Sequence, residues 1–155
     1  MCRIRVRLSF LLALVVLATC LSTLSVMAVS GSWYENSGRM SGYVTNDAWW
    51  ETRMHRIKGA SNASTFQHPQ YLVQTITVTI IFKDRCQYAN GTWAPWQQLA
   101  SNAKGVSWAT TTGEIYAQGQ YQNCMYGHQY RNESVHVFVN SSTGLNTTKN
   151  LSESY

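Results

Sequence analysis

Charged side chains are scarce in this sequence: Asp, Glu, Lys and Arg together make up 12% of its 155 residues. Of the 12 basic residues, Arg3, Arg5 and Arg7 lie ahead of a long apolar run, which leaves nine against seven acidic residues in the rest of the chain. A dedicated nucleic-acid-binding protein needs a clustered basic footprint. The remainder of this chain has a net charge of about +2 and no such cluster, so we exclude nucleic acid as a partner.

Sequence motifs for catalysis or metal binding are also missing. No G-x-S-x-G elbow, P-loop or H-E-x-x-H pair occurs, and no two of the four histidines stand four residues apart. The carboxylates are few and scattered, and the local sequence brings no two of them together as glycoside hydrolysis would need. We therefore expect no catalytic residues, no cofactor and no metal, and we do not expect an enzyme.

Residues 1–28 have the layout of a secretory signal peptide. Three arginines precede an uncharged stretch, residues 8–29, and Ala28 offers a small residue at a cleavage position. We expect cleavage after Ala28 or Ser30 and secretion of the rest, so that the chain meets a membrane only through this segment before it is cleaved. Two alternatives remain: an uncleaved anchor formed by residues 8–29, and a lipoprotein modified at Cys20.

Two cysteines, Cys86 and Cys124, remain after the leader. In an exported protein an even pair favours one disulfide over a metal site, and we expect these two residues to be joined. Six N-x-[ST] sequons could mark surface loops if the host glycosylates Asn. Chance matches are our preferred interpretation, because this part of the chain is rich in Ser, Thr and Asn. The sequons lie at Asn62, Asn90, Asn132, Asn140, Asn146 and Asn150.

Residues 71–83 (YLVQTITVTIIFK) give the clearest element. Apolar side chains recur there at every second position, with threonines on the other face, which predicts a half-buried antiparallel strand. The same alternation carries Cys86 inward, just past the strand end. The inward-facing residues of this strand are expected to be Leu72, Ile76, Val78, Ile80 and Phe82.

Weaker patterns predict further short strands, separated by turns. Asn90-Gly91 is a two-residue turn signal, and Pro95 limits the strand that follows to an edge or bulged position. In the last strand we expect the valines at 135, 137 and 139 on one face and His136 facing outward. We expect loops or turns at 59–70, 102–105 and 123–128. The expected strands cover residues 41–45, 49–58, 93–99, 106–110, 114–121 and 130–139.

Short strands without an amphipathic helix predict an all-β fold, a sandwich or a barrel. We favour a small antiparallel β-sandwich after an N-terminal signal helix. Its core is expected at 71–140, after an irregular part at 29–70 with one or two short strands. Residues 141–155 lack apolar periodicity, and we expect a frayed polar tail there.

The second half of the chain resembles a group of small secreted proteins of Gram-positive bacteria that have an immunoglobulin-like β-sandwich and no assigned activity. The resemblance covers residues 71–140. It lies in the run ITVTIIFKDRC, in NGTW, in GEIYAQGQY, and in CMYGHQYR leading into SVHVFV. It implies an immunoglobulin-like fold and export, and it brings no catalytic residues.

Aromatic residues are plentiful: 18 Phe, Trp and Tyr side chains lie beyond residue 30, which argues against a disordered chain. Exposed rings could stack on sugars or anchor a protein partner, although tryptophan is buried on average. Trp49 and Trp50 must face opposite ways if that stretch is extended, so one of them is a candidate for exposure. The candidate ligand-contact residues are Trp49, Trp50, Trp93 and Trp96.

These observations favour a secreted, non-catalytic β-sandwich protein that binds a cell-envelope glycan or a surface protein. One alternative is a secreted antimicrobial or toxin-like protein, although no amphipathic helix supports membrane insertion. The other is a small secreted hydrolase, because a Ser/His/Asp triad can assemble from distant positions. His55, His128 and His136 are the histidines whose surroundings would distinguish the hydrolase.

Overall fold

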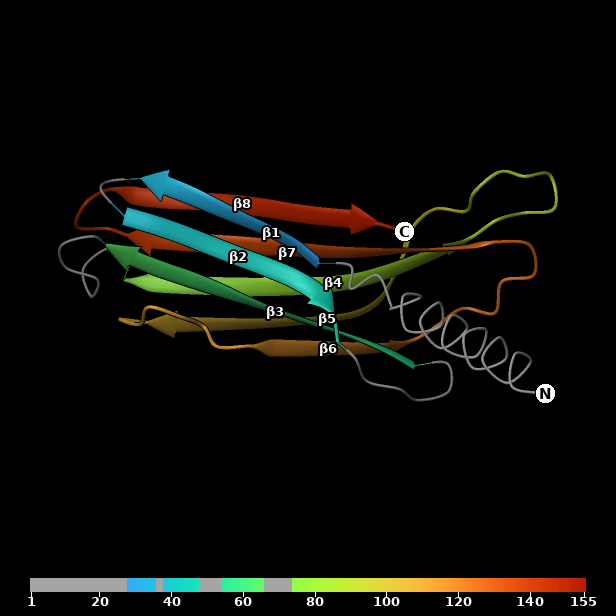
Figure 1. The fold of residues 1–155 in the computed structure, drawn as a ribbon, viewed down its shortest axis with the longest axis horizontal. Coiled ribbons are helices and arrows are strands. Elements are labelled where there is room, and N and C mark those ends of the chain that lie inside the picture. The colour runs from blue at the N-terminus through green and yellow to red at the C-terminus, as the bar shows by residue number, and fades with distance from the viewer. Residues whose placement is uncertain (1–27, 36–37, 48–53, 66–73) are drawn as a thin grey trace, which may run out of the picture.

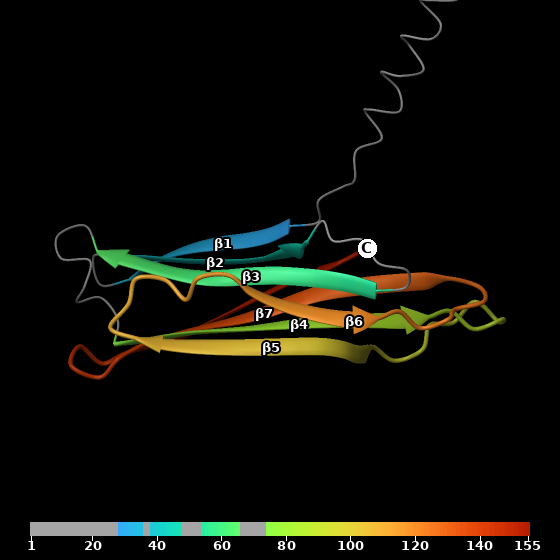
Figure 2. The same ribbon diagram turned by 90° about the horizontal axis from the view of Figure 1, so that it is seen from below.

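A computed structural model describes residues 28–35, 38–47, 54–65 and 74–155 (Figure 1). The expected signal helix before Ala28 lies outside these residues, as do Trp49 and Trp50. The described residues form two four-stranded antiparallel sheets that pack face to face as a β-sandwich, seen edge-on in Figure 2. The all-β fold expected from the sequence is therefore confirmed.

Each sheet combines strands from distant parts of the chain. The first sheet contains, in spatial order, β1 (Ala28–Glu35), β2 (Gly38–Asn46), β3 (Met54–Thr65) and β6 (Ile115–Gln120). The second sheet contains, in spatial order, β5 (Gln97–Ser107), β4 (Thr75–Cys86), β7 (His128–Asn140) and β8 (Leu145–Ser154).

Strand β4 lies in the interior of the second sheet and supplies much of the core. From Ile76 onward its alternation is as predicted: the inward side chains are fully buried and the threonines on the other face are half-buried. Leu72, also expected to face inward, lies outside the described residues. Against them the first sheet places Val44 of β2, Ile57 of β3 and two residues of β6, Ile115 and Ala117. The fully buried side chains of β4 are Ile76, Val78, Ile80, Phe82 and Asp84.

The prediction for the two faces of β7 is wrong. His136 and Phe138 are fully buried, whereas the valines at 135, 137 and 139 are half-buried on the outer face. The pairing with β4 sets this orientation, because His136 is aligned with the buried Val78, and residues aligned across a ladder share a face. Both ring nitrogens of His136 find partners inside, which offsets the loss of water.

Three other predictions need correction. Residues 145–154 form β8, paired along its whole length with β7, and not a frayed tail. The part expected to be irregular, residues 29–70, contributes three strands, β1 to β3, and is more regular than expected. Strand β5 continues through 102–105, where the sequence indicates a turn. β5 and β8 have few apolar side chains to bury, and they are held as strands by their backbone hydrogen bonds to β4 and β7.

Gly42 of β2 lies directly over the ring of His136. A Cβ atom at Gly42 would stand 2.3 Å from two ring atoms, Cε1 and Nδ1. We expect Gly42→Ala to push the sheets apart and to lower the free energy of unfolding by about 1–3 kcal/mol. Urea unfolding measures this loss, with Gly105→Ala as the control, where the new Cβ meets only Thr77 Oγ1 at 3.3 Å. Equal losses in the two variants would contradict the close packing at Gly42.

Candidate functional site

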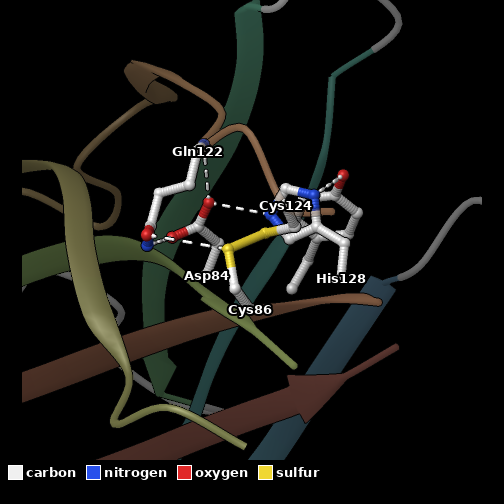
Figure 3. The surroundings of a disulfide bond; sticks show 6 residues. Asp84, Cys86, Gln122, Cys124 and His128 are labelled. Atoms are coloured by element: carbon white, nitrogen blue, oxygen red, sulfur yellow. Dashed lines mark hydrogen bonds and ion pairs between the residues drawn. A yellow bond between two sulfur atoms is a disulfide. The ribbon is translucent and has the colours of Figure 1, made fainter. Parts of the chain in front are cut away.

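One end of the sandwich is fastened by a disulfide. Cys86, the last residue of β4, is bonded to Cys124 in the connection between β6 and β7, with their Cα atoms 5.2 Å apart. This is the predicted pair. A backbone hydrogen bond from Gln87 N to Gly127 O, 2.9 Å long, joins the same two loops. We call the two loops, 87–96 and 121–127, together with this disulfide, the clamped end (Figures 1 and 3).

The first loop of the clamped end turns where the Asn90-Gly91 signal predicts. Gly91 has φ +82°, a conformation that suits glycine. Asn90 Oδ1 accepts hydrogen bonds from the backbone N of Thr92 at 3.0 Å and from its hydroxyl at 2.7 Å. Tyr88 N donates to Thr92 O across the turn. The loop thus has a defined shape that its own polar groups maintain.

A buried carboxylate ties the second loop to β4. Asp84 is fully buried and accepts hydrogen bonds from the backbone N of Gln122 at 3.0 Å and from the side-chain amide of the same residue. His128 Nε2 lies 2.8 Å from Asp84 Oδ2, and its Nδ1 lies 2.8 Å from the hydroxyl of Tyr130. Figure 3 shows this group beside the disulfide. Because a carboxylate only accepts hydrogen bonds, the Nε2–H of His128 is the donor to Asp84.

Large apolar side chains are concentrated at the clamped end. Six such side chains are exposed among the described residues, and three of them belong to its two loops: Tyr88, Met125 and Tyr126, with exposed fractions of 53%, 86% and 62%. A single exposed apolar side chain is ordinary on a protein surface, but a group of exposed apolar side chains is typical of a binding surface. The other three are Tyr34, Trp108 and Tyr116.

Two of the predicted contact residues, Trp93 and Trp96, lie in the first of these loops and are half-buried. The guanidinium carbon of Arg85 is 5.1 Å from the ring centroid of Trp93 and 4.4 Å from that of Trp96. Arg131 approaches Trp96 at 4.4 Å. We call these four residues the cation–π ladder; such contacts each stabilise a site by about 0.5–2 kcal/mol. The ladder holds both rings in place and sets positive charge next to the exposed loops.

His55 lies in a buried polar cluster between the sheets. Its Nε2 is 2.8 Å from Asn46 Oδ1, and its Nδ1 is 2.9 Å from the hydroxyl of Tyr121. Asn46 Oδ1 also accepts hydrogen bonds from Asn132 Nδ2 and from the hydroxyl of Tyr155, each 2.7 Å long. Burial lowers the pKa of His55 to about 4, so the ring is neutral at neutral pH.

His136 stands between two serines, an arrangement that local sequence gave no means of finding. Ser61 Oγ of β3 is 2.7 Å from its Nδ1, and Ser134 Oγ is 2.8 Å from its Nε2. A Ser–His contact is what an acyl-transfer site would need. Here, however, the ring and both hydroxyl-bearing residues are at most 1% exposed. Burial also lowers the pKa of His136 to about 4. The contact therefore serves to satisfy a histidine inside the core.

The two buried histidines predict a loss of stability in mild acid. Their pKa in the folded protein is about 4, against about 6.5 in an unfolded chain. Between these values the unfolded chain takes up protons that the folded protein does not, so stability is full above pH 6.5 and falls as the pH drops toward 4. For the fully buried His136 the loss reaches about 3 kcal/mol. Urea unfolding at pH 7.5 and 4.5 measures it; an unchanged midpoint would contradict the burial of neutral rings.

A second surface feature is a shallow polar hollow of about 480 Å³ on the outside of the first sheet. Arg39 supplies its one cationic side chain, and Tyr34, aligned with Arg39 across the β1–β2 ladder, is 68% exposed beside it. Arg39 Nη2 donates to Ser32 Oγ at 3.0 Å. A cation, hydroxyls and a flat ring together suit an acidic saccharide. The residues that line the hollow are Arg39, Ser41, Asn62, Ala63, Thr110 and Thr111.

Within the described part of the chain, no three His, Cys, Asp or Glu side chains gather at one point, and no helix is long and apolar enough to cross a bilayer. The comparisons with known proteins give no further guide to the site. No protein-family model matches the chain, and the search of curated proteins found no match either.

Proposed function

We propose that this chain is a secreted, non-catalytic binding protein that contacts a protein of the cell surface through its clamped end. The observation that carries the proposal is the grouping of Tyr88, Met125 and Tyr126 as exposed side chains on two loops that one disulfide holds together. Tyrosine is enriched among the residues that dominate protein interfaces, and methionine adapts to irregular apolar surfaces. Loops fixed in advance lose little entropy on binding.

The surroundings of the histidines support a non-catalytic role. His136 is fully buried and His55 is half-buried, and burial lowers the pKa of each ring to about 4. Both ring nitrogens of each are occupied by hydrogen bonds. The carboxylate of Asp84 is fully buried, and its contacts with Gln122 and His128 fasten a loop to β4. Each of these groups thus has a structural task in the fold, which a general base poised for substrate would not have.

A glycan-binding protein is the second candidate, and the polar hollow at Arg39 favours it. Trp93 and Trp96 fit this candidate less well, because both are half-buried and guanidinium groups already lie over them: Arg85 over Trp93, and Arg85 and Arg131 over Trp96. Sugar stacking at the clamped end would need a free ring face. A glycan would therefore bind on the first sheet, beside Tyr34, and the two candidates use different surfaces.

Capture of partners from a cell-envelope extract by the exported protein tests the proposal. Tyr88→Ala combined with Tyr126→Ala is expected to reduce the retained surface protein at least tenfold, because hot-spot residues each contribute about 2 kcal/mol or more. Tyr34→Ala is the matched control, a similarly exposed tyrosine on the outer face of the first sheet, and it should leave capture unchanged. Equal capture by all three proteins would contradict binding at the clamped end.

Two further outcomes would favour the other candidates. Binding to an acidic glycan that is lost in Arg39→Ala and kept in the clamped-end variant would replace the surface protein by a glycan. Growth inhibition of neighbouring cells by the purified exported protein would support the antimicrobial alternative and contradict our proposal.

A further inference from the structure

Two buried oxygen atoms among the described residues accept no hydrogen bond: Asn132 Oδ1 and Glu153 Oε2. The two residues are aligned in the β7–β8 ladder and so share the inward face. Asn132 is fully buried. Both atoms are acceptors, and one of them belongs to a carboxylate, so a single cationic donor placed between them would satisfy both.

The neighbouring groups do not supply that donor. Asn132 Nδ2, the hydroxyl of Tyr155 and His55 Nε2 all point to one atom, Asn46 Oδ1. His55 is neutral at neutral pH, since burial lowers its pKa to about 4. Among the described residues, no Lys, Arg or His forms an ion pair with Glu153. The missing donor must come from another part of the molecule.

Strand β1 passes this position from the opposite sheet. A Cβ atom on Gly31 would lie 3.1 Å from Leu151 Cδ2 of β8, while Trp33 packs on His136 and Phe138. Gly31 thus lies at Leu151, and Trp33 lies at His136, which is aligned with Lys149. Residue numbers rise along β1 as they fall along β8, so the two strands run in opposite directions. Two residues back from Gly31 along β1 is Val29, and two residues beyond Leu151 along β8 is Glu153. Val29 therefore lies level with Glu153. In Figure 1 the start of β1 and the end of β8 lie toward the same end of the sandwich.

The β1–β2 ladder places Val29 in the same way. Val29 is aligned with Val44 and packs against the core cluster that contains Val44. The next inward residue of β2 after Val44 is Asn46, which is hydrogen-bonded to Asn132. β1 and β2 are antiparallel, so the chain before Val29 is aligned with the residues of β2 after Val44. The main-chain nitrogen of Val29 therefore lies on the Asn46 side of its Cα atom.

We propose that a protease of the export machinery cuts between Ala28 and Val29, and that the new α-ammonium of Val29 binds Glu153 Oε2 and Asn132 Oδ1. Hydrolysis adds one water across the peptide bond: Ala28 leaves with a carboxylate, and the amine of Val29 takes up a proton. The resulting ammonium has a positive charge and three N–H donors. Removal of the leader thus completes the polar cluster between the sheets.

The register distinguishes this cut from one after Ser30. An amine on Gly31 would lie about 7 Å further along β1, given a rise of about 3.3 Å per residue. At that level the aligned residues of the second sheet are Ser134 and Leu151, and neither has a carboxylate. The inference rests on the export included in the proposed function and does not depend on binding at the clamped end.

Expression of the full chain with its leader in an exporting host, followed by N-terminal sequencing of the protein in the medium, should give Val29 as the first residue. The α-amine is then labelled with an amine-reactive reagent near pH 7, and the rate at Val29 is followed by mass spectrometry. An ion pair favours the unreactive charged form. We therefore expect Glu153→Gln to raise the labelling rate about tenfold, the change that corresponds to one pKa unit.

Glu133→Gln is the matched control, since Glu133 neighbours Asn132 on the outer face and pairs with Lys83 at 2.7 Å; its labelling rate should equal that of the wild type. A glycine inserted after Ala28, so that the exported chain starts one residue earlier, should label as fast as Glu153→Gln and does not disturb the carboxylate.

Wild-type protein that starts at Gly31, or that labels as fast as its urea-unfolded form, overturns the pairing. A chain retained by the cells with Arg3 attached overturns the export itself. Partner capture by the Tyr88/Tyr126 variant is a separate measurement, and its outcome changes neither the N-terminal sequence nor the labelling rate of Val29.

Discussion

Replacing Asp84 by alanine is expected to lower the free energy of unfolding by about 3–5 kcal/mol. The carboxylate is fully buried and accepts two hydrogen bonds from Gln122 and one from His128. Removal of the carboxylate leaves a backbone N–H, an amide and an imidazole without their acceptor in a place that water reaches poorly. Urea unfolding of the oxidised, exported protein at pH 7 measures the loss.

Glu133→Ala is the control for Asp84→Ala. Glu133 also pairs with a basic residue, Lys83, but both side chains are partly exposed, and such pairs stabilise proteins by about 1 kcal/mol or less. Asp84→Asn should fall between the two, because its amide oxygen still accepts one or two of the hydrogen bonds. Equal losses in Asp84→Ala and Glu133→Ala would show that the buried network contributes no more than a surface ion pair.

The sequence predicts β4 well because its alternation has one reading. Isoleucine, valine and phenylalanine take every second position from Ile76 to Phe82, and the opposite face is mostly threonine and basic residues, so one face must be the core. The same alternation places Cys86 at the end of the strand, and the Asn90-Gly91 pair independently predicts the turn that follows. The disulfide was predictable because only two cysteines, Cys86 and Cys124, follow the apolar N-terminal segment.

In β7 the same rule gives the wrong face, because both faces have apolar side chains. Three valines alternate with His136 and Phe138, and a buried histidine is the less common choice. The residues that make room for a buried histidine lie far away in the sequence: Ser61 hydrogen-bonds one ring nitrogen, and Gly42 leaves space above the ring. Neither residue has any local signal of its role, since Ser61 is 75 positions before His136.

Strands β5 and β8 were missed or misplaced for a different reason. Both lie at the edges of the second sheet, and most of their side chains are polar. Backbone hydrogen bonds to β4 and β7 hold them, and sequence patterns report side-chain burial rather than backbone pairing. In β8 only a few inward residues, such as Leu145 and Thr147, mark the buried face.

The candidate site could be foreseen in part. Trp93 and Trp96 lie in one of the two loops that expose apolar side chains, although both rings are half-buried and packed against arginine side chains. Tyr88, Met125 and Tyr126 had no pattern to single them out. They come together because the disulfide and the Asp84 network bring two loops to one end, which is a property of the fold.

Removing the disulfide by Cys86→Ser with Cys124→Ser is expected to cost about 3–4 kcal/mol of stability under oxidising conditions. The bond closes a loop whose ends are 38 positions apart, and the open chain gains entropy mainly when it unfolds. The double variant avoids a free thiol that could form intermolecular bonds. Thermal unfolding with and without reductant measures the loss: reductant should lower the midpoint of the wild type to that of the variant and leave the variant unchanged.

The same variant separates stability from binding. At a temperature where the double variant is fully folded by circular dichroism, the two loops of the clamped end keep the Asp84 network and the Gln87–Gly127 hydrogen bond but lose their covalent link. If preorganisation contributes to partner capture, the folded variant should retain the surface protein several-fold less well than the wild type. Gly42→Ala is also destabilised, but its substitution lies in β2 against His136 and away from both loops. Once folded, this variant should retain the surface protein as well as the wild type does. Capture that follows global stability in both variants would mean that the disulfide acts on the fold alone.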